Sequence, residues 1–93
     1  MDKLPLLSAI EIHRRLATLP GWQRQGDAIR RTFTFAGFPE SVEFVRTLVA
    51  PAEAMGHHPD VDLRYNRVIV TLSTHDSGGI TENDLALAER ITG

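Results

Sequence analysis

Apolar residues recur along the first part of the chain at the spacing of an amphipathic helix. Ser8 and Glu11 match a capping box, in which the serine hydroxyl and a glutamate three residues later each accept from a backbone N–H at the helix start. Ile12, Leu16 and Leu19 follow at helical spacing. The pattern predicts a first helix that begins after Ser8 and ends near Leu19, before a Pro-Gly pair.

The next segment changes to the alternating period of a half-buried strand. Two strands are predicted, at 22–24 and 29–35, on either side of a turn at 25–27. Ile29, Phe33 and Phe35 lie on one side of the second strand, and Arg31 interrupts that apolar side. We expect these strands to form a hairpin.

Helical spacing returns after residue 38. Pro39 suits the first turn of a helix, where its missing N–H is not needed, and Val42, Val45 and Val49 follow at i, i+3 and i+7. Pro51 is unfavourable inside a helix, because it removes a hydrogen bond and crowds the preceding turn at a cost of about 3 kcal/mol. We therefore expect a kink or an early end at Pro51.

A second hairpin is predicted from strands at 62–65 and 67–73. Asn66 lies between them and tolerates the left-handed backbone that a tight turn can need. The apolar face of the second strand carries Val68, Val70 and Leu72, and the other face carries Ile69, Thr71, Ser73 and His75. His75 is thus expected at the strand end, beside a cleft and outside the core.

A last helix is predicted after the glycine pair at 78–79. Thr81 is its expected cap, with Asp84 at the third position and Leu85, Ala88 and Ile91 facing inward. The order of elements predicts an α+β fold, a four-stranded antiparallel sheet with three helices on one face (α-β-β-α-β-β-α). No repeat, low-complexity tract or linker divides the chain, so residues 1–93 are expected to form a single domain.

Composition narrows the possible functions. A chain of 93 residues has a thin core, so oligomerisation would help its stability. Its net charge of −2, from mixed acidic and basic residues, does not favour binding to nucleic acid. With no cysteine, disulfides and thiolate metal sites are excluded. The sequence has neither a signal-peptide core nor an apolar run of roughly 20 residues for a membrane span, which predicts a soluble, cytoplasmic protein.

Three histidines in two short clusters are the candidate active site. His57 and His58 are adjacent, and neighbouring side chains in an extended segment point to opposite sides. They could therefore act on different atoms of one ligand, with His75 returning on the second hairpin. Imidazole can act as acid or base near neutral pH. A lone surface histidine is usually only a polar residue, so His13 is assigned no role.

The segments around these histidines resemble the pterin-4a-carbinolamine dehydratase family. The likeness is carried by Ala-Glu-Ala-Met-Gly-His-His-Pro-Asp at 52–60 and Leu-Ser-Thr-His-Asp-Ser-Gly-Gly at 72–79. It continues through Gly21-Trp22, 29–35 and Phe38, and through Asp84 to Ala88, so it covers nearly the whole chain.

The resemblance implies the same α+β fold and a hydro-lyase reaction that needs no cofactor or metal. The reaction is the dehydration of 4a-hydroxytetrahydropterin to the quinonoid dihydropterin, in tetrahydrobiopterin recycling. The catalytic residues it implies are His57, His58 and His75, and the substrate-binding residues are Glu53, Pro59, Thr74, Asp76 and Ser77. It also implies a homodimer or homotetramer, with an aromatic amino-acid hydroxylase as a possible partner.

Several of these residues have a physical reason for their role. Glu53 precedes His57 by one helical turn, so its carboxylate could orient an imidazole or accept from N–H groups of the pterin. Pro59 biases His58 towards extended backbone. Thr74, Asp76 and Ser77 could bind the ring edge, although Thr74 and Ser77 are also ordinary turn residues.

Other interpretations of the same residues stay open. Asp84 has a plain explanation as a helix cap, which we rank above a role at the substrate. The histidines and Asp76 could instead bind zinc or iron, although adjacent histidines diverge in extended backbone. A non-catalytic regulatory or assembly protein of the same fold is a further alternative. Val61 stands where many relatives carry an aromatic residue, which could alter how the pterin is covered.

Overall fold

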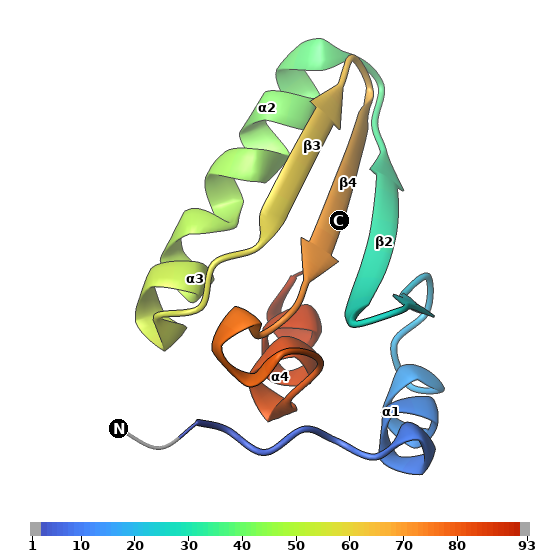
Figure 1. Ribbon diagram of the computed structural model, residues 1–93. Helices are drawn as coiled ribbons and strands as arrows, with labels where there is room; N and C mark the ends of the chain where they lie inside the picture. Colours follow the sequence, from blue (N-terminus) through green and yellow to red (C-terminus); the bar gives the residue numbers. More distant parts are fainter. Residues whose placement is uncertain (1–2, 92–93) are drawn as a thin grey trace.

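The computed structural model describes residues 3–91. Its elements are α1 (Ala9–Leu16), β1 (Gln23–Gln25), β2 (Ala28–Thr34), α2 (Phe38–Thr47), α3 (Val49–Met55), β3 (Asp60–Arg64), β4 (Arg67–Leu72), the short 3-10 helix η1 (His75–Ser77) and α4 (Glu82–Arg90) (Figure 1). The strands form one antiparallel sheet in the order β1-β2-β4-β3. The predicted fold is confirmed, with the second of the three helices divided into α2 and α3.

The core lies between the helices and one face of the sheet. Strand residues on this face are almost fully buried: Ile29, Phe33, Val68, Val70 and Leu72. α2 and α3 run along the sheet beside β3, and α4 lies beyond the end of β4 (Figure 1). The opposite face of the sheet carries mostly polar side chains, which gives the alternation expected for a sheet covered on one side.

Pro51 explains the division of the second helix. α2 ends at Thr47, α3 begins at Val49, and Pro51 occupies the third position of α3. In a continuous helix its nitrogen would face the carbonyl of Thr47 without an N–H to donate. In the first turn of a new helix no such bond is needed. The predicted kink or early end is confirmed, and it sets the direction in which α3 approaches the histidines.

Of the three valines that predicted this helix, only Val45 packs against the core. Ser41, Phe44 and Leu48 are buried, whereas Val42 is 45% exposed and Val49 is 58% exposed. Phe44 fills the core because its ring packs 4.5 Å, centroid to centroid, from that of Phe33. The valine spacing therefore predicted a helix correctly, but these two valines do not mark its buried side.

α1 ends at Leu16, earlier than the predicted end near Leu19. The chain leaves the helix in a turn in which the hydroxyl of Thr18 donates to the carbonyl of Arg15 at 2.9 Å. Leu19 is buried in the core, but it lies in this turn and not in α1. Helical spacing in the sequence could not separate these two arrangements.

Arg15 connects α1 to α4 through two ion pairs. Its guanidinium bonds to Glu82 at 2.5 Å and to Glu89 at 2.6 Å, both on α4. Hydrogen bonds to Glu82 and then to Glu89 raise the pKa of Arg15 above its usual range. The first and last helices are thus joined at the end of the sheet from which α4 extends.

The second hairpin also departs from its prediction. β3 begins at Asp60 instead of residue 62, and Tyr65, not Asn66, takes the left-handed conformation with φ of 52°. Asn66 instead donates its side-chain amide to the carbonyl of Phe35 at 3.3 Å. β4 ends at Leu72, so His75 lies beyond the strand, in η1.

The buried face of α2 can be tested by stability. We expect Phe44→Ala to lower the free energy of unfolding by about 3–5 kcal/mol, because it leaves a cavity beside Phe33. Val42→Ala on the exposed side should change it by less than about 1 kcal/mol. Urea denaturation of both variants measures this, and equal losses would contradict the assignment of the two faces.

Candidate active site

A glycine in the left-handed conformation ends α3 directly before the first two histidines. Gly56 ends α3 with φ of 60°, a conformation that residues with a Cβ rarely adopt. Its N–H donates to the carbonyl of Glu53 at 3.2 Å, and the N–H of His57 donates to that of Ala52 at 3.0 Å. The helix therefore stops sharply, and His57 and His58 follow immediately before β3.

His57 is bound to a fully buried carboxylate. Its Nε2 lies 2.6 Å from Oδ1 of Asp84, and the side chains are 11% and 0% exposed. The other oxygen of Asp84 accepts from the hydroxyl of Thr74 at 2.8 Å and from the backbone N–H of Thr81 at 2.9 Å. The hydroxyls of Thr74 and Thr81 are 2.7 Å apart. We call these four residues the Asp84 network.

The Asp84 network fixes which nitrogen of His57 can meet a ligand. A buried carboxylate is costly unless donors surround it, and here three groups can donate to Asp84. We therefore assign the proton to Nε2 of His57, which donates to Asp84 and leaves Nδ1 as an acceptor. The predicted capping role of Asp84 is confirmed by a complete capping box at the start of α4. The pairing with His57 is a second role, which a local reading of the sequence did not reveal.

His58 is paired with a different carboxylate. Its Nε2 lies 2.5 Å from Oε2 of Glu53, and both side chains are about two-thirds exposed, at 64% and 66%. Glu53 thus lies against His58 and not against His57. Because this pair faces solvent, we expect its geometry to be less constrained than that of the Asp84 network.

The second histidine cluster forms a tight turn after β4. The N–H groups of Ser77 and Gly78 donate to the carbonyl of Thr74, each at 3.0 Å. His75 and Asp76 are exposed, whereas the hydroxyl of Ser77 donates to the carbonyl of Leu4 at 2.7 Å. The Thr74 and Ser77 hydroxyls are therefore already bonded within the protein, and His75 and Asp76 are presented to solvent.

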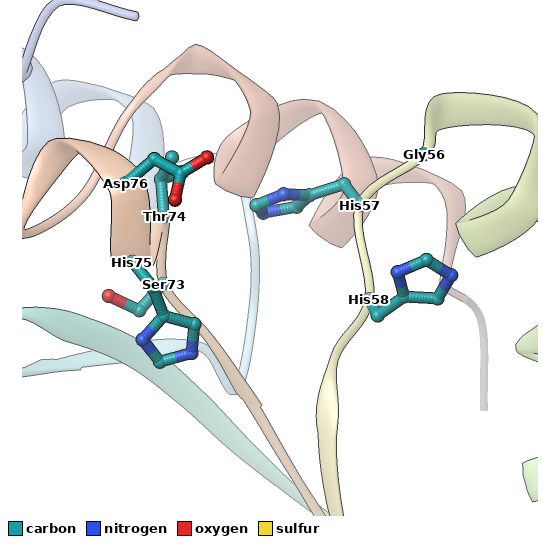
Figure 2. Close-up of a pocket in the computed structure, with 7 residues that line it drawn as sticks. All are labelled: Gly56, His57, His58, Ser73, Thr74, His75 and Asp76. Carbon is teal, nitrogen blue, oxygen red and sulfur yellow. The ribbon is translucent and has the colours of Figure 1, made fainter. Parts of the chain in front are cut away.

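The two clusters face each other across a shallow cavity of about 220 Å³. It is lined by Gly56, His57, His58, Ser73, Thr74, His75 and Asp76 (Figure 2). The ring of His57 points towards Thr74 and Asp76, and the ring of His58 points the opposite way (Figure 2). The cavity brings together all three predicted catalytic histidines.

The other predicted binding residues line neighbouring cavities. Glu53 and Pro59 border an apolar cavity of about 210 Å³ next to His58, together with Val61. Ser77 borders a further cavity of about 220 Å³, which His57 also lines. Only Thr74 and Asp76, of the five predicted binding residues, line the cavity that holds the three histidines.

The geometry gives no support to the metal interpretation. Within residues 3–91, no group of three or more histidine or carboxylate side chains converges closely enough to hold a metal ion.

The same part of the chain contains no helix long and apolar enough to cross a membrane.

Comparisons with known proteins agree on one family. The family model described as pterin 4 alpha carbinolamine dehydratase matches residues 5–93. A protein of Thermosynechococcus vestitus, named "Putative pterin-4-alpha-carbinolamine dehydratase", is 52% identical over 86 residues, which cover 92% of this chain and 90% of that protein. A protein of Chloroflexus aurantiacus with the same name is 51% identical over 88 residues, or 95% of each chain.

Two solved structures are similar to this chain. The transcriptional coactivator/pterin dehydratase from Brucella melitensis superposes with a TM-score of 0.88 and 37% identity, over 94% of this chain and 95% of that one. A pterin dehydratase-like protein identified as a RuBisCO assembly factor of the alpha-carboxysome gives a TM-score of 0.59 and 25% identity, over 75% and 81% of the two chains.

The Asp84 network makes a prediction about stability. Asp84→Ala leaves the Thr81 N–H without its acceptor and frees His57, and we expect it to lower the free energy of unfolding by about 1–3 kcal/mol. Asp76→Ala removes an exposed carboxylate from the same site and should change it by no more than about 0.5 kcal/mol. Denaturation in urea compares the two, and a small effect at Asp84 would contradict the network.

Proposed function

Because this chain belongs to the pterin-4a-carbinolamine dehydratase family, we propose that it dehydrates a 4a-hydroxytetrahydropterin to the quinonoid dihydropterin by histidine acid/base catalysis. The observation that carries the proposal is the His57–Asp84 pair at 2.6 Å, in a cavity that also holds His58 and His75. The reaction would serve the recycling of tetrahydropterins such as tetrahydrobiopterin.

The chemistry needs one proton donor and one proton acceptor. The hydroxyl on C4a leaves as water after it receives a proton, and a ring nitrogen loses a proton as the new double bond forms. A side chain positioned for such a transfer typically contributes about 10²–10⁴-fold in rate. Imidazoles on both sides of one cavity suit this task, because a bound pterin could meet the acid and the base at the same time.

The three histidines have different surroundings, which supports a division of labour. His57 is nearly buried and is held through Nε2, so its Nδ1 is the group best positioned to accept a proton. His58 is oriented by Glu53, and His75 is exposed on η1. Asp84 acts as a positioning residue, since it holds the imidazole of His57 in one tautomer as a carboxylate does in other acid/base sites.

The alternative function is non-catalytic. The two similar structures include a protein described as a transcriptional coactivator and one described as an assembly factor, so the fold also serves binding roles. A binding protein would have no need for three histidines around one cavity. We therefore favour the enzyme and leave the binding role as an outcome of the test.

We expect the purified chain to accelerate the dehydration of a freshly generated 4a-hydroxytetrahydropterin, followed by stopped-flow absorbance in metal-free buffer. His57→Ala should lower the rate by about 10²–10⁴-fold, because it removes the positioned acid/base group. Alanine at His58 or His75 should also lower it.

His13 provides the matched control, because it is exposed on α1, away from the site, and His13→Ala should leave the rate unchanged. If the folded wild type gave no acceleration, the proposal would fail and the binding role would replace it. Activity that appeared only after a divalent ion was added would favour the metal interpretation instead.

A homodimer or homotetramer is part of the same proposal. Phe38, Val42 and Val49 form an exposed apolar stripe along α2 and α3, with exposed fractions of 52%, 45% and 58%. β1 and β3 are the outer strands of the sheet and offer open edges for pairing. Burial of the stripe against a second copy would remove apolar surface from water.

Light scattering at micromolar concentration should give a mass of two or four chains, and Val42→Asp combined with Val49→Asp should reduce it. A wild-type mass of one chain would overturn the oligomer without affecting the proposed reaction. The cytoplasmic location, the single domain and a hydroxylase partner stay predictions from the sequence.

A further inference from the structure

A polar cavity of about 340 Å³ lies away from the histidines, on the face of the sheet that the helices do not cover. It is lined by Gly21, Gln23, Gln25, Arg30 and Thr32, and none of these residues lines the cavity of Figure 2. Its volume reaches the range of about 300–1,000 Å³ that is typical of small-molecule sites. The cavity is therefore large enough for a small ligand and separate from the proposed active site.

The β1–β2 hairpin builds this cavity at the side of the sheet away from β3, where Figure 1 shows β2. Gln23 pairs with Arg30 across the two strands, and the same register continued by two residues places Gly21 opposite Thr32. Ile29 is buried in the core, so the alternation of β2 turns Arg30 and Thr32 to the uncovered face. Because Gly21 has no side chain, the space beside Thr32 stays open.

The same hairpin carries positive charge that is not neutralised by neighbouring carboxylates. Within residues 3–91, the arginines that form ion pairs are Arg14, Arg15, Arg46 and Arg64. Arg24, Arg30 and Arg31 form none in this part of the chain. Asp27 is the only acidic residue at positions 12–39. The hairpin is thus locally basic in a chain whose net charge is −2.

Contacts within the protein hold two of these guanidinium groups at the cavity. A terminal nitrogen of Arg30 donates to the side-chain oxygen of Gln25 at 2.7 Å, which leaves its other N–H groups for a ligand. Arg31 lies over the ring of Phe33, 4.3 Å from the ring centroid. It also lies against Gly21, because a Cβ at that position would be 2.8 Å from Nε of Arg31. Arg30 is therefore oriented by its neighbour, and Arg31 adds a second positive charge beside a lining residue.

The polar groups of the cavity suit a phosphate group. Guanidinium binds phosphate oxygens through two parallel hydrogen bonds, which adds geometric fit to the attraction between charges. None of the five lining residues is acidic, so no carboxylate among them would repel an anion, whereas a cation would meet Arg30. The amides of Gln23 and Gln25 and the hydroxyl of Thr32 can donate to phosphate or bind hydroxyls attached to it.

We propose that this cavity is a binding site for a phosphate group, with Arg30 as the principal binding residue. The space around Arg30 and the additional polar side chains favour a small phosphate monoester over the free ion. The site shares no lining residue with the histidine cavity, so the inference is independent of the proposed function.

A titration followed by ¹H–¹⁵N spectra at constant ionic strength of about 0.15 M tests the site, because the shifted signals also locate the ligand. The ligands are ribose 5-phosphate, inorganic phosphate and ribose. We expect saturable shifts of the Gly21 and Thr32 backbone signals and of the Arg30 Nε–H signal with ribose 5-phosphate, and none with ribose. Arg30→Gln should weaken the binding by about tenfold or more, and Thr32→Val should weaken it severalfold.

Arg67→Gln is the matched control for Arg30→Gln. Arg67 lies on the same face, forms no ion pair within residues 3–91, and pairs with Thr34, four residues along β2 from Arg30. This offset is about 13 Å at the rise of a strand, which exceeds the screening length of about 8 Å at this ionic strength. The control should therefore change the affinity by less than about twofold.

The outcomes separate the phosphate site from general attraction to positive charge. Equal affinity for inorganic phosphate and ribose 5-phosphate would support the site and identify the free ion as its ligand. Absence of saturable shifts with both phosphate compounds would overturn the proposal, as would equal weakening by Arg30→Gln and Arg67→Gln.

Discussion

The buried carboxylate of Asp84 is the interaction on which the site depends. It accepts from Thr74 in the turn after β4, from Thr81 at the start of α4, and from His57 between α3 and β3. Three segments that are distant in the sequence are therefore joined at one side chain that is fully excluded from solvent. The same contacts that complete the fold at this point also orient the imidazole. Stability and the proposed chemistry are therefore coupled, and we expect a change at Asp84 to alter both.

The rest of the fold brings these segments to the same end of the sheet. Pro51 divides the second helix and redirects α3, and Gly56 then stops α3 so that His57 comes next to α4. The sheet supplies the other half of the site, because β4 carries the chain from the core directly into the turn that holds His75. The histidines thus lie on short connections that are anchored at both ends by regular elements.

Much of this arrangement could be predicted from the sequence, because it depends on local signals. The capping box at Thr81, the effect of Pro51 and the two hairpins each follow from residues that are close together in the chain. The family resemblance identified the three histidines, which the structure brings to one cavity. The buried side of α2 was harder to predict, since Val45 packs against the core but Val42 does not, and the main core residue is Phe44, which packs against the rings of Phe33 and Phe35.

The contacts of the site were harder to predict, because they join residues that are distant in sequence. Asp84 and His57 are 27 positions apart, and a local pattern shows only that Asp84 can cap a helix. The alignment of Asp84 with a family position was the one signal of its second role.

The protonation of His57 tests the central claim most directly. Long-range ¹H–¹⁵N correlation spectra of the histidine rings identify which nitrogen carries the proton in the neutral form. The Asp84 network predicts the proton of His57 on Nε2, with Nδ1 as the free acceptor, and loss of this preference in Asp84→Ala. A proton on Nδ1, or a tautomer mixture that Asp84→Ala leaves unchanged, would contradict the account.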